Sequence, residues 1–267
     1  MIALISGNHK DGKTVSSCTF PKPMLVIDFN GGMLSLKHTK DVKGQLVVTE
    51  QEKITVVSLA KNQTSCIEFK TANDKDFKAA AAPAFTFSAP PVWDKYNKIM
   101  SDLAIDGCIS ASIVNETAVG RIGPFRTIVI DALSDMFRLW DELIMSRNNI
   151  PSLRIQDYKT LKLALFNQFI PSIKTLNIDY VILINHTVID KDGLTGQIIE
   201  FPVGPSDNAG RQLGQMFDEV WLQKREGTRF VWHTIPFGFF QAGSRLSVPD
   251  GIDATYQSLK RAVPNIL

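Results

Sequence analysis

Residues 7–14 read GNHKDGKT, a stretch whose residue types and spacing suit the binding of phosphate. The stretch fits G-x-x-x-x-G-K-[ST] at every fixed position, and average composition gives such a match in a chain of this length about once in a hundred cases. It follows an apolar run and opens a predicted helix, which is the context that the motif requires. The sequence therefore predicts a phosphate-binding loop. The alternative is an ordinary polar turn between a strand and a helix.

Each fixed position of this loop has a physical role. Gly7 and Gly12 let the backbone wrap tightly and turn its N–H groups inward. Lys13 supplies a cation to the β- and γ-phosphates, and the Thr14 hydroxyl is a ligand for Mg²⁺. The amino terminus of the following helix adds a favourable partial charge. The residues expected to bind a nucleoside triphosphate are Gly7, Asn8, His9, Lys10, Asp11, Gly12, Lys13, Thr14 and Val15.

A loop of this kind needs a second group to hold the hydrated metal ion, and the segment TIVIDA offers one. Its apolar and β-branched residues predict a buried strand that places Asp131 at the carboxyl end, the ligand-binding edge of a parallel sheet. We expect Thr14 and Asp131 to hold the metal together. The alternative for Asp131 is a strand-end residue that caps the next helix.

The elements that position these residues are short apolar strands alternating with amphipathic helices. This order favours an α/β fold with a mostly parallel central sheet flanked by helices. The predicted strands are 2–6, 24–29, 45–49, 54–59, 66–69, 126–131 and 179–186, and the predicted helices are 14–19, 92–103, 133–147, 156–175, 208–217 and 253–262. Hairpins at 187–201 and 219–235 predict antiparallel additions toward the carboxyl terminus. We expect a single domain over residues 1–267, with an Ala- and Pro-rich loop at 79–91.

Composition excludes several classes of protein. The net charge of +2 argues against a strongly basic coat for nucleic acid, although a local basic groove stays possible. The three cysteines are widely spaced, which indicates neither a zinc site nor a disulfide framework. No apolar run reaches the length of a membrane span, and the first residues lack a signal-peptide pattern. A cytoplasmic location is the simplest expectation.

The order of the motifs resembles that of the RecA-like P-loop ATPases. The phosphate-binding loop is followed by VIDFN, then by TIVID, then by VILINH, each a strand that ends in polar residues. The phage-encoded RecA-like ATPases of recombination are similar in size and in carrying a loop like QAGSRLSVP before a last helix. The resemblance covers roughly residues 1–260. It implies a RecA-like fold, ATP and Mg²⁺ as ligands, and ATP hydrolysis coupled to single-stranded DNA in recombination, annealing or replication. It also implies a homo-oligomer that forms a ring or a filament, located in the host cytoplasm if the chain is phage-encoded.

The resemblance places Asp28, Phe29 and Asn30 at the family's Asp-x-Glu motif, whose glutamate activates the attacking water. Here Asn30 stands at the position of that glutamate. An amide cannot accept the proton of water as a carboxylate does, but it can orient the water. Hydrolysis is therefore expected to be slow, or to use Asp28 or another carboxylate. The alternative for Asp28 is a strand-end residue that bonds a nearby backbone N–H.

Two more site residues are carried over from the resemblance. His186 falls where the family keeps a polar sensor of the γ-phosphate, and the alternative is a strand-end histidine bonded to backbone. Arg245, in GSR, lies where the family often has a Lys-x-Arg pair that reaches the phosphates of a neighbouring subunit. Gly243 replaces the lysine of that pair. Arg245 alone is a candidate finger in trans, with a solvated loop arginine as the alternative.

Three functions remain open at this point. The first is the DNA-coupled ATPase, although the expected DNA-facing hairpin carries Asp190, Asp192 and Glu200 beside Lys191 and is not a basic finger. The second is a nucleotide-gated binding or assembly module with slow hydrolysis, which Asn30 and Gly243 favour. The third and least favoured is a small-molecule kinase, which shares the phosphate-binding loop.

Overall fold

The computed structural model describes residues 1–31, 48, 50–59, 67–69, 85–87, 92–191 and 195–266. Over these residues ten strands form one sheet, in the order β14-β12-β11-β1-β9-β8-β2-β3, with β10 added to β9 and β13 to β11. Six strands are mutually parallel: β1 (Ile2–Gly7), β2 (Met24–Asp28), β3 (Ile54–Ser58), β8 (Thr127–Asp131), β9 (Tyr180–Lys191) and β11 (Glu219–Glu226). The mixed α/β fold with a mostly parallel sheet agrees with the prediction.

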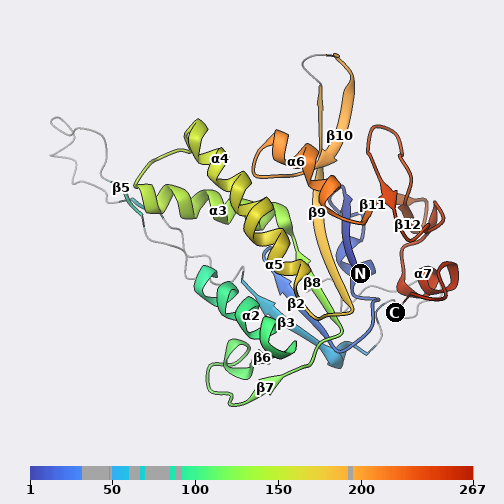
Figure 1. Cartoon of the computed structure of the whole chain (residues 1–267), viewed down its shortest axis with the longest axis horizontal. Coiled ribbons are helices and arrows are strands. Elements are labelled where there is room, and N and C mark those ends of the chain that lie inside the picture. The colour runs from blue at the N-terminus through green and yellow to red at the C-terminus, as the bar shows by residue number, and fades with distance from the viewer. Residues whose placement is uncertain are drawn as a thin grey trace.

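The antiparallel strands lie where the two hairpins were predicted, with two short additions. They are β10 (Ile198–Pro202), β12 (Arg229–His233), β13 (Gly243–Ser244) and β14 (Ile252–Asp253). The predicted strand 179–186 continues to Lys191 because its second half pairs with β10. This β9–β10 hairpin projects beyond the rest of the sheet (Figure 1).

Helices cover both faces of the sheet, because alternate residues of each strand point to opposite sides. Leu4 belongs to one buried cluster, and its neighbours Ala3 and Ile5 belong to another. The first cluster is covered by α2 (Val92–Asp106), α3 (Leu133–Asn148), α5 (Ile170–Lys174) and α6 (Asp207–Leu213). The second is covered by α1 (Lys13–Ser17) and α7 (Tyr256–Ala262). Figure 1 shows α2, α3 and α5 lying across one face.

The predicted helix 156–175 is not continuous. It begins as α4 (Ile155–Ala164), widens into a π-helical segment, η5 (Leu165–Phe169), and ends as α5. The interruption precedes Pro171, which has no N–H to donate to the helix, and this explains the local widening. The last helix begins at Tyr256 rather than at 253, because the Thr255 hydroxyl caps it by accepting the N–H of Ser258.

Several predicted segments fall wholly or partly outside the described residues. The predicted strand 45–49 lies outside them except for Val48, and so does the hairpin turn at 192–194. Of the predicted loop 79–91, only β5 (Phe85–Phe87) is described, and it pairs with β4 (Ile67–Phe69). The short 3-10 helices are η2 (Gln51–Lys53), η4 (Ala111–Ile113) and η6 (Gly214–Met216).

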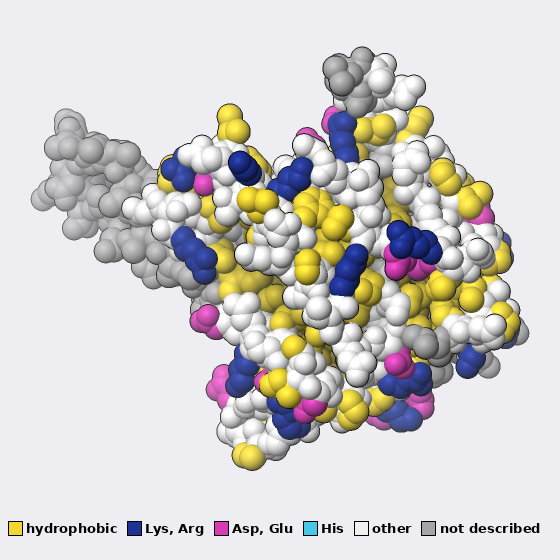
Figure 2. Space-filling model, viewed as in Figure 1, with side chains coloured by type: hydrophobic (Ala, Val, Ile, Leu, Met, Phe, Trp, Pro, Cys, Tyr) yellow, Lys and Arg dark blue, Asp and Glu magenta, His cyan; other side chains and the backbone are white. Residues whose placement is uncertain are grey.

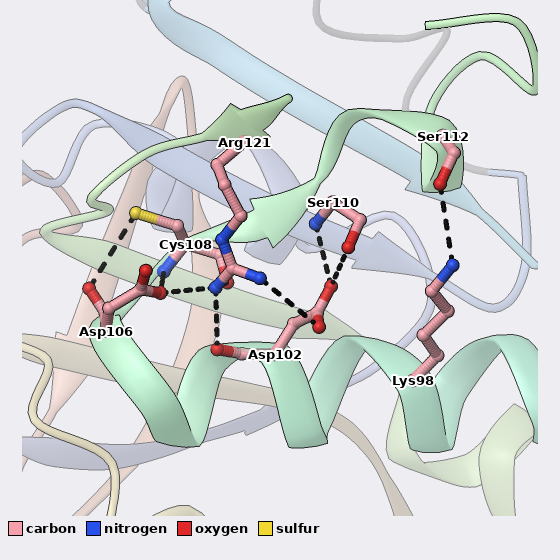
Figure 3. A network of polar contacts seen from close by, with 7 residues as sticks. All are labelled: Lys98, Asp102, Asp106, Cys108, Ser110, Ser112 and Arg121. Carbon is pink, nitrogen blue, oxygen red and sulfur yellow. Dashed lines mark hydrogen bonds and ion pairs between the residues drawn. The ribbon is translucent and has the colours of Figure 1, made fainter. Parts of the chain in front are cut away.

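A polar network fixes a small hairpin, β6 (Ile109–Ser110) and β7 (Arg121–Ile122), to the end of α2. The Asp102 carboxylate accepts from both the N–H and the hydroxyl of Ser110 at 2.7 Å. The Arg121 guanidinium bonds the Asp106 carboxylate and the backbone oxygens of Asp102 and Cys108 (Figure 3). This network lies at the amino-terminal edge of the sheet, because the N–H of Phe125, two residues before β8, bonds the oxygen of Gly107. It is therefore a structural anchor remote from the phosphate-binding loop.

Among the described residues, no helix combines the length and the hydropathy needed to cross a bilayer.

Candidate active site

The loop between β1 and α1 has two positions, Gly7 and Gly12, that suit glycine alone. Gly12 has φ of +75°, a left-handed conformation, and a Cβ there would lie 3.0 Å from three ring atoms of Phe230. A Cβ on Gly7 would lie 2.5 Å from the backbone oxygen of Gln223, which is too close for any side chain. The Asp11 carboxylate closes the loop by accepting the N–H of Asn8 at 2.8 Å. The fixed glycines of the motif are thus explained by geometry.

The Lys13 side chain lies across this loop and is buried. Its Nζ donates to the backbone oxygens of Gly7 at 3.0 Å and Asn8 at 2.6 Å. Burial lowers the pKa of Lys13 to about 8, and the charges of Asp11 and Asp131 oppose that shift. At neutral pH the ammonium group therefore stays charged, and it is bonded to carbonyl groups that an anion can replace.

The structure brings Thr14 and Asp131 together as predicted, although 117 residues separate them in the chain. The Thr14 hydroxyl donates to Asp131 Oδ2 at 2.5 Å, and Asp131 is almost wholly buried. Burial raises the pKa of Asp131 to about 6. The Asp28 charge acts in the same direction, and the Thr14 bond and the Lys13 charge act against it. Two hard oxygen atoms thus lie side by side at the rim of the loop.

Asp28 and Asn30 lie at the end of β2, next to Asp131. Asp28 pairs in register with Asp131, so the two carboxyl groups occupy neighbouring strand ends. Asp28 Oδ1 accepts the N–H groups of Asn30 at 3.1 Å and Gly31 at 2.7 Å. One oxygen of Asp28 therefore shapes the turn, which is the structural role considered for it. Asn30 is exposed in that turn, directly after β2.

His186 also joins the site. It pairs in register with Gly7, is half-buried, and its ring centre lies 5.9 Å from that of His9. Burial lowers its pKa, and the positive charge of Lys13 adds to the effect, so the ring is neutral at pH 7. The adjacent Asn185 has a structural role instead, because it is buried and donates to the oxygen of Val203 at 2.7 Å.

The structure does not place Arg245 with the other predicted residues. Arg245 follows β13, whose Ser244 pairs with Glu219, and Glu219 in turn pairs with Ala3 at the start of β1. Its guanidinium is exposed and bonds the Asp218 carboxylate at 2.5 Å. Arg245 therefore lies at the edge of the sheet opposite the loop, where it cannot reach the phosphates held by its own chain.

A cavity of about 660 Å³ lies beside Arg245, between β10, α6 and residues 239–245. Its walls include Glu200, Phe201, Arg211, Phe217, Phe240 and Arg245, and none of residues 7–15. Ion pairs already neutralise its charged groups, since Glu200 bonds Lys224 and Arg211 bonds Asp190. The cavity is therefore separate from the phosphate site.

The sequence did not reveal Gln223, which braces the loop from β11. Gln223 is fully buried, and its Oε1 accepts from the Ser16 hydroxyl at 2.6 Å and from Trp232 Nε1 at 2.9 Å. Its Nε2 donates to the oxygen of Asp11 at 2.6 Å. The available signal was a polar residue at the carboxyl end of an apolar parallel strand, the same edge as the loop.

The half-buried Asp135 in the first turn of α3 was also missed, and its charge acts on both Asp131 and His186.

Comparison with known proteins gives one family. A family model described as AAA domain matches residues 1–246. No curated protein matches the chain.

The raised pKa of Asp131 predicts a stability cost that depends on pH. The folded state holds the proton of Asp131 more tightly than the unfolded state does. Protonation of Asp131 therefore contributes its full stabilisation of the fold below about pH 4, and this contribution is lost as pH rises through about 6. Without metal or nucleotide, Asp131→Asn should therefore raise the free energy of unfolding at pH 8 by up to about 3 kcal/mol, measured by urea unfolding. The gain should shrink toward zero near pH 4. Equal gains at both pH values would contradict the assignment.

Gln223→Leu should damage both the fold and the loop. Leucine cannot bond Ser16, Asp11 or Trp232, so the free energy of unfolding should fall by about 2–4 kcal/mol and nucleotide affinity should fall with it. Urea unfolding and calorimetric titration with MgATP measure the two effects. Gln212→Leu is a matched control, because that side chain donates to Asn208 one turn earlier in α6, away from the loop. An unchanged affinity in Gln223→Leu would show that the loop does not depend on this brace.

Proposed function

The chain belongs to the AAA domain family, and from this premise we propose that it is a RecA-like ATPase that acts on single-stranded DNA. The observation that carries the ATPase is the contact of Thr14 with Asp131 at the rim of a loop that Lys13 crosses. A mere polar turn between strand and helix requires neither a buried carboxylate at a neighbouring strand end nor a buried lysine.

The donor set at the rim suits Mg²⁺. Thr14 Oγ1 and Asp131 Oδ2 are hard oxygen atoms, and Mg²⁺ usually takes one or two protein oxygens together with water and phosphate oxygens. Thr14 and Asp131 would hold the ion, with the raised pKa of Asp131 lowered once a cation lies beside it. When bound, the ion supplies positive charge to the β- and γ-phosphates.

The loop residues bind and orient the triphosphate. Lys13 is proposed to exchange the carbonyl oxygens of Gly7 and Asn8 for phosphate oxygens, an exchange that keeps its ammonium group paired. The N–H groups around Gly12 and the amino terminus of α1 face the same anion. These contacts fix the phosphates in front of Asp28 and Asp131, which end β2 and β8, and of His186 in β9.

Water activation is the weak step of this site. Asn30 is proposed to orient the attacking water, and it cannot take up a proton at neutral pH. His186 is neutral and half-buried, which suits a sensor that donates or accepts a hydrogen bond near the γ-phosphate. Hydrolysis should therefore be slow unless Asp28 or Asp135 removes the proton.

The proposals that the protein binds single-stranded DNA and that it assembles into oligomers rest on the resemblance of its motif order to that of the RecA-like ATPases. On the face shown in Figure 2, the Lys and Arg side chains of the described residues are scattered and form no continuous basic stripe. We propose that several copies together build the groove that binds DNA. Arg245 is proposed to act in trans, and because it lies at the far edge of the sheet, that role requires a neighbouring copy. We propose a ring or filament of single-domain subunits in the cytoplasm of the host cell of a phage.

A second candidate function is a nucleotide-gated assembly module. Asn30 favours it, because a site that holds MgATP but lacks a carboxylate base works as a switch rather than a motor.

Steady-state ATP hydrolysis with and without single-stranded DNA tests the first candidate. Turnover should rise several-fold with DNA and disappear in Lys13→Ala, since the lysine pairs with the phosphates. Tight MgATP binding with negligible turnover in both conditions would instead establish the second candidate. If wild type and Lys13→Ala bind MgATP equally, neither candidate holds.

Asn30→Glu should restore a base directly after β2. If residue 30 faces the attacking water, turnover should rise by at least about tenfold, since a positioned base contributes more than that in other enzymes. Asn148→Glu, at the exposed end of α3, is a control for added charge. Equal turnover in Asn30→Glu and wild type would place water activation elsewhere.

A further inference from the structure

The hairpin of β11 and β12 stands beside the loop, and Gln223 and Trp232 are the residues of it that were described above as bracing the loop. We propose that Phe230 and Arg225 on this hairpin form the platform on which the base of the bound nucleotide stacks. This inference rests on the proposed function, since it supplies the nucleoside end of the same site.

The phosphate end of the site fixes where the base must lie. Asp131, proposed to hold the metal, ends β8, and His186, proposed to sense the γ-phosphate, lies within β9 beside Gly7; both strands lie on one side of β1. The triphosphate chain therefore leads away from those strands as it runs from the γ-phosphate to the ribose. On the other side of β1 lie β11 and β12.

The hairpin extends past the edge of the sheet at that point. Ser6, just before the loop, pairs with Leu222, and β11 continues for four further residues. Those residues stay paired with β12, as Lys224 with Val231 and Arg225 with Phe230. The end of the hairpin thus lies beside the loop, beyond the carboxyl end of β1, where the nucleoside part of the bound nucleotide is proposed to lie.

The Phe230 ring faces the loop. A Cβ on Gly12 would touch three atoms of this ring, so the ring packs directly on the residue before α1. Trp232, two residues on and on the same face of β12, bonds the loop brace Gln223. Phe230 is only half-buried, so the residue is not enclosed by the core cluster on which it packs.

Arg225 completes the platform from the partner strand. It is exposed, it lies directly opposite Phe230, and its guanidinium carbon is 6.0 Å from the ring centre. Its Nε donates to the oxygen of Gly227 at 3.1 Å, which holds the group on the hairpin. An aromatic ring and a guanidinium both present flat faces, and a nucleobase is a planar π-system of matching chemistry.

A stacking platform recognises the face of a base rather than its edge. Discrimination between bases is then weak, because every base offers a π-face. We therefore expect MgATP and MgGTP to bind with affinities within about tenfold of each other.

Calorimetric titration with MgATP and with inorganic tripolyphosphate separates the base from the phosphates. Phe230→Leu keeps an apolar contact with Gly12 but lacks the flat ring. It should weaken MgATP binding by about tenfold and leave tripolyphosphate affinity unchanged. Arg225→Lys keeps the charge but loses the planar group, lies on the surface, and should weaken MgATP alone by several-fold. Phe239→Leu, an exposed aromatic residue of the loop after β12, is the control and should change neither affinity.

The outcomes distinguish this inference from the proposed function. Equal losses for MgATP and tripolyphosphate in Phe230→Leu would mean that the ring only supports the loop, and an unchanged MgATP affinity in both variants would place the base elsewhere. Either result overturns the platform and leaves the ATPase standing. Failure of the wild-type protein to bind tripolyphosphate or MgATP would overturn the proposed function, and the platform with it.

Discussion

The hydrogen bond from Thr14 to Asp131 is the interaction on which the rest of the site depends. It joins the first turn of α1 to the end of β8 and spans the strand β9 that lies between β1 and β8. Only a parallel sheet, with the carboxyl ends of its strands at one edge, brings these two residues together. Gly7, Asp28 and His186 reach the same edge for the same reason, through the register of β1, β2, β8 and β9.

The site is assembled at a cost in stability. Burial shifts the pKa of Lys13 down and that of Asp131 up, so both groups are disfavoured in their charged forms. Each charge partly compensates the other, and the remaining partners are backbone oxygens of Gly7 and Asn8 and the hydroxyl of Thr14. A ligand that brings an anion to Lys13 and a cation to Asp131 satisfies both groups. Such strain at a ligand site is common where function competes with stability.

The sequence predicted the parts of the site that depend on local pattern. The fixed glycines, Lys13 and Thr14 follow from the motif, Asp131 follows from an apolar strand that ends in a carboxylate, and His186 was carried over from the resemblance of the motif order. The structure brings these residues to one edge of the sheet, because the carboxyl ends of parallel strands lie at the same edge irrespective of the loop conformations. Gln223 and Phe230 were not predicted, since their roles arise from the pairing of β11 with β1 and of β12 with β11, which single-strand patterns do not encode. The π-helical segment before Pro171 was likewise hidden within a regular helical pattern, and the edge on which Arg245 lies became clear only from its pairing through β13.

The most direct test of this account is the affinity for ATP, with and without Mg²⁺, in Thr14→Val, Asp131→Asn and the double variant. If the two residues hold one ion, each single change should weaken Mg²⁺-dependent binding by at least about tenfold, and the double variant should be no worse than the weaker single variant. Without Mg²⁺ the four proteins should bind ATP alike. Losses that add in full, or that persist without Mg²⁺, would show that Thr14 and Asp131 do not share a metal ion and would contradict the central claim.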